Sequence, residues 1–102
     1  MMRFRKSMYI APSVRNPRKI KWKLRTGRGS LDIYVMVLNH DSGKLEYFHN
    51  GMLKQKILHN RDMDIVGLAG TTGECIELIE RMTADAHDIT GQYDIYRYLM
   101  QV

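Results

Sequence analysis

A buried strand, a turn and an amphipathic helix are encoded in one continuous stretch, MDIVGLAGTTGECIELIERMTADAHDITG, at residues 63–91. Residues 63–69 are almost wholly apolar, as is typical of a short strand inside a sheet. Thr71 and Glu74 have the S/T-x-x-E spacing of a capping box, which predicts that a helix begins there, and Gly91 is suited to end it. One face of this helix is predicted from apolar residues that recur at steps of three and four, namely Cys75, Ile79, Met82, Ala86 and Ile89.

Two strands are predicted before this unit, joined by the turn residues Thr-Gly-Arg-Gly-Ser at 26–30. Residues 19–25 alternate strictly between apolar and cationic side chains, and a period of two predicts a strand with one buried and one charged face. Trp22 falls on the apolar face in this interpretation, so we expect it in the core. Residues 31–38 are apolar nearly throughout, which predicts a central strand. We expect the two strands to form an antiparallel hairpin.

Two segments allow alternative interpretations. Residues 44–60 contain apolar residues at helical spacing, yet Asn50 and Gly51 form the strongest short hairpin signal. A helix broken near Gly51 and a second hairpin both remain open, and the helix is preferred because the next strand then connects as a parallel crossover. Residues 93–99 alternate loosely and predict a last strand, with a short terminal helix as the alternative.

The predicted elements combine into an α/β fold of the α+β-like kind. We expect a two-layer sandwich, in which a mixed four-stranded sheet starts with an antiparallel hairpin and about two helices pack on one face. The length of 102 residues suits one domain. Residues 1–18 show no periodicity and contain Pro12 and Pro17, which predicts a flexible basic arm. Residues 19–102 are expected to form the single domain.

Several features of the sequence bear on the cellular location of the protein. No apolar run approaches the length of about 18 residues that spans a bilayer, so no membrane partner is expected. The N-terminal residues lack the apolar segment of a secretory signal. Cys75 is the one cysteine, and a lone thiol makes no internal disulfide, which fits a reducing compartment. These features predict a cytoplasmic protein.

Charge is distributed unevenly along the chain. Residues 1–31 contain ten Lys and Arg residues and no acid, whereas residues 32–102 carry a net charge of −5. A basic segment of this kind predicts an anionic partner, either nucleic acid or an acidic protein, or else a contact between the basic and the acidic parts of the chain. The alternative explanation is that an edge strand carries lysines that prevent edge-to-edge aggregation. The candidate nucleic-acid or polyanion-binding residues are Arg15, Arg18, Lys19, Lys21, Lys23, Arg25 and Arg28.

Tyrosines gather near the C-terminus around one arginine. Tyr93, Tyr96, Arg97 and Tyr98 form a candidate interface, because Tyr and Arg dominate the binding energy of many protein contacts. This cluster, or an open sheet edge, would support a homo-oligomer. The alternative is ordinary packing of the tyrosines within the sheet.

The turn Gly70–Cys75 is a third candidate site. Free amides at a helix N-terminus attract anions and lower the pKa of a nearby thiol, which would suit a small enzyme. However, the glycine spacing matches neither a P-loop nor a dinucleotide fingerprint, and Glu74 itself occupies the anion position. The histidines, His40, His49, His59 and His87, show no metal-ligand spacing. We therefore assign no catalytic residue, cofactor or metal.

Three functions from different classes are compatible with these features. We expect first a small non-enzymatic binding or regulatory module that contacts nucleic acid or another polyanion through its basic arm and strand. The second is a protein–protein interaction or self-associating module that uses the C-terminal tyrosines or a sheet edge. The third, a small enzyme acting at the Gly70–Cys75 turn, ranks last because no nucleophile–base pair is visible in the sequence.

Overall fold

The computed structural model describes residues 2–27, 31–59 and 62–101. Within these residues the sheet has four strands in the order β1-β4-β2-β3. β1 runs parallel to β4, whereas β2 is antiparallel to both β4 and β3, so the predicted mixed four-stranded sheet is confirmed. The strands are β1 (Met2–Ile10), β2 (Tyr34–Asn39), β3 (Lys44–His49) and β4 (Met63–Ala69).

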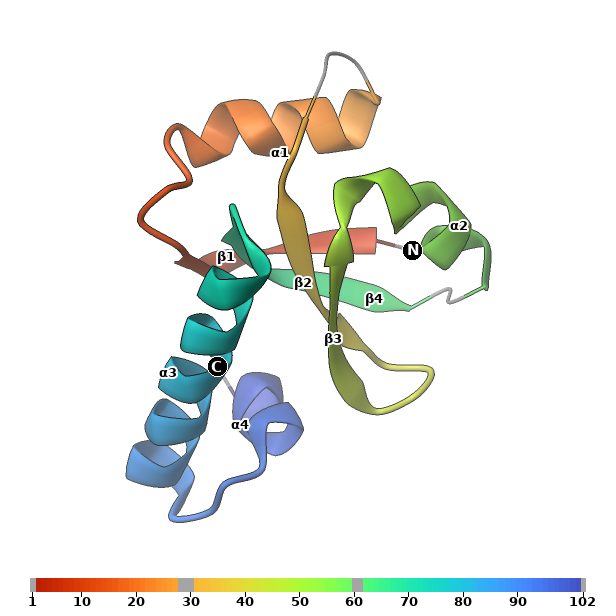
Figure 1. Cartoon of the computed structure of the whole chain (residues 1–102). Coiled ribbons are helices and arrows are strands. Elements are labelled where there is room, and N and C mark those ends of the chain that lie inside the picture. Colours follow the sequence, from red (N-terminus) through yellow and green to blue (C-terminus); the bar gives the residue numbers. More distant parts are fainter. Residues whose placement is uncertain (1, 28–30, 60–61, 102) are drawn as a thin grey trace.

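Two helices pack on one face of the sheet. α3 contacts α4 and the central strands β4 and β2, and α4 contacts β3. Figure 1 shows α1 on the other side of the sheet from α3 and α4. None of the helices within the described ranges is long and apolar enough to cross a lipid bilayer. The helical elements of the described residues are α1 (Pro17–Thr26), the 3-10 turn η1 (Asn50–Met52), α2 (Leu53–His59), α3 (Thr72–Thr90) and α4 (Ile95–Gln101).

The core surrounds the two central strands. Every residue of β4 is buried, and so are Val35, Met36, Val37 and Leu38 of β2. A strand buried on both faces needs cover on both sides, so this pattern confirms the central position that the apolar run predicted. Helices α3 and α4 supply buried side chains to the same core.

The strand–turn–helix unit at residues 63–91 forms as predicted. Thr71 is the N-cap of α3, and its Oγ1 accepts a hydrogen bond from the amide of Glu74 at 3.1 Å. Gly91 ends the helix with a φ of 77°, a conformation that glycine adopts without strain. The predicted apolar face is buried or half-buried except at its C-terminal end, where Ile89 is 61% exposed.

The strand predicted over residues 19–25 is wrong, because these residues lie in α1. Asn16 caps the helix through its Oδ1, which accepts a hydrogen bond from the amide of Lys19 at 3.3 Å. Pro17 occupies the first turn, where its missing N–H leaves no bond unmade. Gly27 ends the helix with a φ of 67°. These local start and stop signals outweigh the alternation of side chains.

The flexible arm expected over residues 1–18 is also contradicted, because Met2–Ile10 form the edge strand β1. The arginines of this segment made it look polar in the sequence. Arg3 donates from Nε to Oδ1 of Asp64 at 2.7 Å, and Arg5 donates from Nη2 to Oδ2 at 3.3 Å. These cations are paired with a carboxylate on the neighbouring strand. The periodicity test looks for apolar side chains at such positions, so it does not detect the strand. A bulge further interrupts the alternation.

The antiparallel hairpin is made by β2 and β3 rather than by the two strands predicted first. Its turn includes Gly43, whose φ of 71° favours glycine. Residues 44–60 contain a strand followed by helical turns, so neither predicted form describes the whole segment. The predicted turn at 26–30 falls partly on residues 28–30, which lie outside the described residues.

The last strand predicted over residues 93–99 is wrong, and the terminal helix that was its alternative forms as α4. Asp94 caps this helix, because its Oδ1 accepts a hydrogen bond from the amide of Arg97 at 3.1 Å. Tyr98 and Leu99 are buried, and Ile95 is half-buried, at spacings of three and four residues. A helix of this length is decided by its cap and its packing rather than by the β propensity of Tyr and Ile.

Candidate functional site

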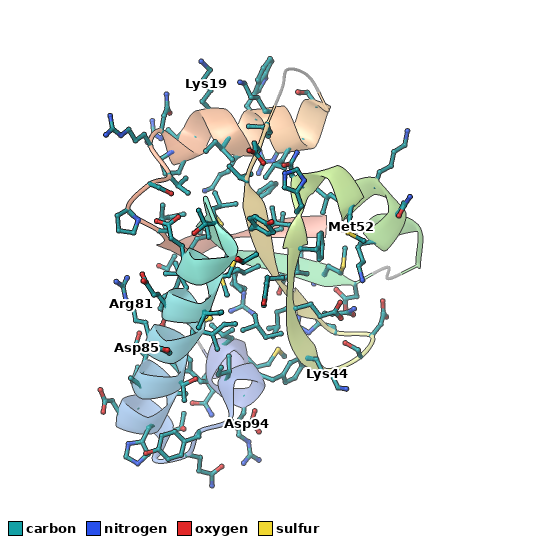
Figure 2. The ribbon with its side chains drawn as sticks, viewed as in Figure 1. Lys19, Lys44, Met52, Arg81, Asp85 and Asp94 are labelled. Atoms are coloured by element: carbon teal, nitrogen blue, oxygen red, sulfur yellow. The ribbon has the colours of Figure 1, made fainter. Side chains whose placement is uncertain are left out.

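α1 presents an exposed face on which a tryptophan stands among cations. Trp22 is 52% exposed. Residues three and four apart are neighbours on a helix surface, so Arg18, Lys19 and Arg25 flank the indole. Figure 2 shows Lys19 projecting from α1 away from the sheet. These four residues are called the α1 face below.

The core position expected for Trp22 is therefore wrong. Ile20 and Leu24 do pack against the core, as expected, and both are half-buried. In a strand Trp22 would point the same way as these two residues. In a helix each residue is rotated by about 100° from the one before, so Trp22, two residues after Ile20, points about 200° away from it. The change from strand to helix thus moves the indole from the core to the basic surface.

Most of the predicted polyanion-binding residues fall on this helix. Arg15 is exposed just before the helix cap, and Arg28 lies outside the described residues. Arg25 lies over the ring of Phe4 on β1, 5.0 Å from its centroid. Among the described residues, no acidic side chain forms a salt bridge with a cation of α1, so its positive charge is not neutralised. The α1 members of the predicted set are Arg18, Lys19, Lys21, Lys23 and Arg25.

A second polar site, which is not among the candidate sites of the sequence analysis, surrounds Asp64. Its carboxylate accepts hydrogen bonds from Nε2 of His40 at 2.9 Å, from Nε of Arg3 at 2.7 Å and from Nη2 of Arg5 at 3.3 Å. Nδ1 of His40 lies 2.9 Å from the hydroxyl of Tyr96. These residues line an open pocket of about 640 Å³. Asp64, His40, Arg3, Arg5 and Tyr96 are called the Asp64 cluster below. This cluster joins β1, β4, the turn after β2 and α4.

The contacts of Asp64 explain its charge state. Burial alone would raise the pKa of this carboxyl, but hydrogen bonds from His40 and Arg3 and the charges of both arginines lower it. The carboxylate is thus paired within the protein, which fits a structural role. Among the described residues, no three His, Cys, Asp or Glu side chains are arranged to hold a metal ion.

One sequence signal could have indicated this cluster. Arg3 and Arg5 stand two positions apart in the sequence, and so do Asp62 and Asp64. Arg3 also forms a salt bridge with Asp62. Matching spacings of opposite charge are typical of facing pairs on neighbouring strands. The signal has meaning only once β1 and β4 are known to be adjacent.

The C-terminal tyrosines do not share one surface. Tyr98 is buried, and its hydroxyl lies 3.0 Å from that of Tyr9. Tyr96 belongs to the Asp64 cluster. Tyr93 and Arg97 are exposed. Of the candidate interface, therefore, two residues are engaged inside the molecule and two remain accessible to a partner.

The Gly70–Cys75 turn holds no accessible thiolate. Cys75 is fully buried, and burial, followed by the charge of Glu74, raises the pKa of its thiol. The carboxylate of Glu74 accepts hydrogen bonds from Oγ of Ser13 at 2.5 Å and from the amide of Gly70 at 2.8 Å. The start of α3 is thus already occupied by a negative charge from the chain itself.

Three comparisons with known proteins give no match. No family model matches this chain, and neither a curated protein nor a solved structure is significantly similar to it. The function is therefore inferred from the residues and contacts of the chain alone.

Proposed function

We propose that this protein binds single-stranded nucleic acid through the α1 face. The observation that supports the proposal is Trp22, half-exposed at the centre of a helix surface whose cations have no acidic partner among the described residues. Lys and Arg side chains contact phosphates, and an indole provides a surface on which a base stacks. Binding of this kind is salt-dependent and largely independent of base sequence.

An unpaired base suits this surface better than a duplex does. The indole stacks on the flat face of a base, and in a duplex that face is already covered by the next base pair. A flexible single strand turns its bases toward Trp22 while its phosphates remain near Arg18 and Lys19. We therefore expect a preference for single-stranded over double-stranded nucleic acid.

An anionic membrane surface is a poorer partner for the same helix. A helix that lies in a membrane interface buries a whole apolar face among the lipids. In α1 the apolar residues Ile20 and Leu24 pack against the core of the protein instead. Trp22 is the one large apolar side chain of the helix left exposed among the described residues.

The test is fluorescence anisotropy of a labelled oligo(dT) or oligo(U) of about 20 nucleotides, and of a matched duplex, across a salt series. With three cations on phosphates, we expect log Kd for the single strand to change by ~2 per tenfold change in salt. Trp22→Ala should weaken binding by about tenfold, whereas Trp22→Phe, which keeps an aromatic ring, should weaken it less. Equal affinity for the duplex would contradict the role of base stacking.

Charge reversal locates the surface. The double variant Arg18→Glu/Lys19→Glu should weaken binding and reduce the salt dependence. The matched control is Lys44→Glu/Arg97→Glu, which makes the same change in net charge at exposed residues outside α1. Figure 2 shows Lys44 far from Lys19. If the control weakens binding equally, or if the protein binds anionic vesicles but no oligonucleotide, the proposal is overturned.

Self-association is a second candidate function. It is favoured by large apolar side chains that remain exposed on α3 and α4 and between them, namely Ile76, Ile89, Tyr93 and Met100. Size-exclusion chromatography in high salt tests it, because salt screens contacts between charges but not between apolar side chains. We also propose a cytoplasmic location, since the buried thiol of Cys75 suits a reducing compartment.

A further inference from the structure

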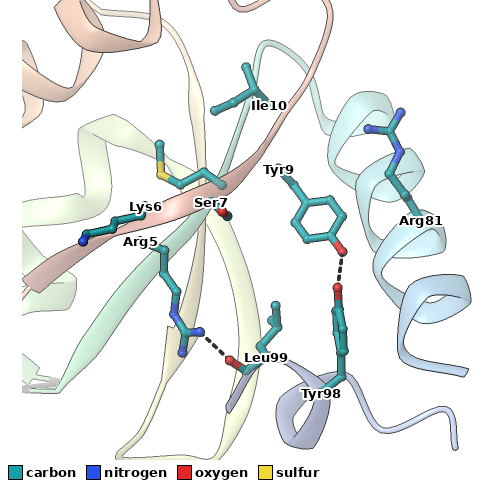
Figure 3. A pocket seen from close by; sticks show the side chains of 9 residues that line it. Arg5, Lys6, Ser7, Tyr9, Ile10, Arg81, Tyr98 and Leu99 are labelled. Carbon is teal, nitrogen blue, oxygen red and sulfur yellow. Dashed lines mark hydrogen bonds between the residues drawn. The ribbon is translucent and has the colours of Figure 1, made fainter. Parts of the chain in front are cut away.

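A groove runs along the free edge of β1. Its volume is about 710 Å³, and consecutive residues of β1 from Arg5 to Ile10 line it together with Arg81 of α3 and Tyr98 and Leu99 of α4. Successive side chains of a strand point to opposite faces, so a pocket lined by consecutive residues adjoins the strand edge. β1 is the outermost strand on this side of the sheet. Figure 3 shows the groove between β1 and these two helices.

The backbone of β1 is not fully paired at this point. Phe4 pairs with Ile65 of β4, and the next paired residue of β1 is Tyr9, opposite Gly67. Four residues of β1, from Arg5 to Met8, therefore stand opposite a single residue of β4. Among the described residues, the register with β4 gives Lys6, Ser7 and Met8 no opposite residue of their own. Because β1 is the outermost strand of the sheet, those of its peptide groups that point away from β4 face no other strand of the described residues, and a chain that approaches from this edge can pair with them.

The side chains around the groove favour an anionic occupant. Lys6 and Arg81 are exposed, and among the described residues neither forms a salt bridge. Arg5 lies at one wall, where it donates to the carbonyl oxygen of Leu99. No lining residue of the described chain is acidic. The nearby acid Asp85 already accepts a hydrogen bond from the hydroxyl of Tyr9 at 2.5 Å.

We propose that this groove binds an extended acidic segment of another protein, which adds to the sheet alongside β1. Only an extended chain uses the peptide groups of a strand edge, which excludes a helical occupant. Acidic side chains would meet Lys6 and Arg81, and intervening apolar side chains would contact Met8, Ile10 and Leu99. This site is separate from the α1 face and does not depend on the nucleic-acid proposal.

A second copy of this chain fits the groove poorly. Pairing β1 with another β1 would place Arg5 and Lys6 near the same cations of the partner, and like charges on facing strands are destabilising. A single-stranded nucleic acid also fits poorly, because the described residues that line the groove include no exposed aromatic ring for stacking. Tyr98 is buried, and the hydroxyl of Tyr9 is bonded to Asp85.

The first test is fluorescence polarisation of the full chain with a labelled peptide of alternating Glu and Val residues. Three peptides separate the contributions: the Glu/Val peptide, a Lys/Val peptide, and a Glu/Val peptide whose backbone amides are N-methylated at alternate residues. We expect the first to bind and the second not to bind. The N-methylated peptide should bind about tenfold more weakly, because it has lost backbone donors. Equal binding of the N-methylated peptide would overturn the added-strand geometry.

Protein variants localise the site. Lys6→Glu/Arg81→Glu should weaken the Glu/Val peptide by at least ~10-fold, whereas the matched control Arg18→Glu/Lys19→Glu should leave it unchanged. The same control should weaken oligonucleotide binding, so failure of one proposal is distinguishable from failure of the other. If the groove variant loses its fold by circular dichroism, amide chemical shifts of the unaltered chain decide the question. Shifts confined to residues 5–10 and their neighbours in α3 and α4 support the site.

Three outcomes overturn the proposal. The first is that the Glu/Val peptide does not bind the unaltered chain at millimolar concentration. The second is that it binds and shifts the amides of α1 rather than those of β1. The third is that an oligonucleotide, and not the peptide, shifts residues 5–10, which would assign the groove to nucleic acid.

Discussion

Asp64 on β4 and His40 in the turn after β2 are joined by a hydrogen bond of 2.9 Å between Oδ2 and Nε2. An ionised carboxylate only accepts hydrogen bonds, so Nε2 carries the proton. Nδ1 of the same ring lies 2.9 Å from the hydroxyl of Tyr96 on α4. Through this pair, a central strand is connected to the last helix of the chain.

The substitution Asp64→Asn should destabilise the protein by about 3 kcal/mol, because the mostly buried Arg5 loses the charge of this carboxylate, although Arg3 keeps its salt bridge with Asp62. Urea unfolding measures this loss as a lower transition midpoint with an unchanged slope. Asp88→Asn is the matched control, since Asp88 is exposed on α3. If the two variants are equally stable, the Asp64 cluster does not hold the fold together.

Stability should fall in acid. The pKa of Asp64 is lowered in the folded protein, so its contribution is fully present above the unfolded value of about 3.9. The contribution is lost progressively as the pH falls below that value and through the folded pKa. Urea midpoints between pH 7 and about pH 3 should decrease, and Asp64→Asn should flatten this decrease. Glu74, whose pKa is also lowered, acts in the same direction, so some decrease should remain.

Cys75 should react slowly with thiol reagents in the native protein. The side chain is fully buried, and the pKa of its thiol is raised, so both access and thiolate fraction are low. We expect the native reaction with a chromogenic disulfide to be at least ~100-fold slower than in denaturant. A reaction in native buffer as fast as that of the unfolded chain would reopen the Gly70–Cys75 turn as a chemical site.

The cap of α3 should contribute measurably to stability. Thr71→Ala removes the acceptor for the amide of Glu74 and should cost about 1 kcal/mol. Thr71→Ser keeps the hydroxyl and should cost much less. Thr72→Ala, at the first helical position, provides a control that removes a neighbouring hydroxyl. A thermal or urea transition of Thr71→Ala that matches the unaltered protein would show that Glu74 and Ser13 hold this turn without the cap.

The fluorescence of Trp22 should report an exposed indole among cations. This is the one tryptophan of the chain, so its emission is unambiguous. We expect iodide to quench it more strongly than caesium, because the neighbouring cations attract anions. Arg18→Glu/Lys19→Glu should reduce iodide quenching. Emission that resists both ions would place the indole in the core, as the alternation of residues 19–25 first indicated.

The elements whose signals are local follow from the amino-acid sequence alone. β4 and α3 follow from an apolar run, a cap and a helical repeat within residues 63–91, and the burial of β2 follows from its own composition. Each of these signals depends only on whether the side chains of a short segment are buried, and not on which other segment buries them. The sequence likewise showed that cations are concentrated in residues 15–25, but it did not show which of them share one surface.

The role of β1 and the direction in which Trp22 points depend on contacts between segments that are distant in the sequence. Arg3 and Arg5 belong in a strand because Asp64, about 60 residues away in sequence, lies beside them. Trp22 is exposed because Ile20 and Leu24 pack on the core and leave the indole on the opposite side of a helix. Periodicity describes how apolar residues repeat within a segment. It does not predict which distant charged residue or which layer of the fold will contact that segment.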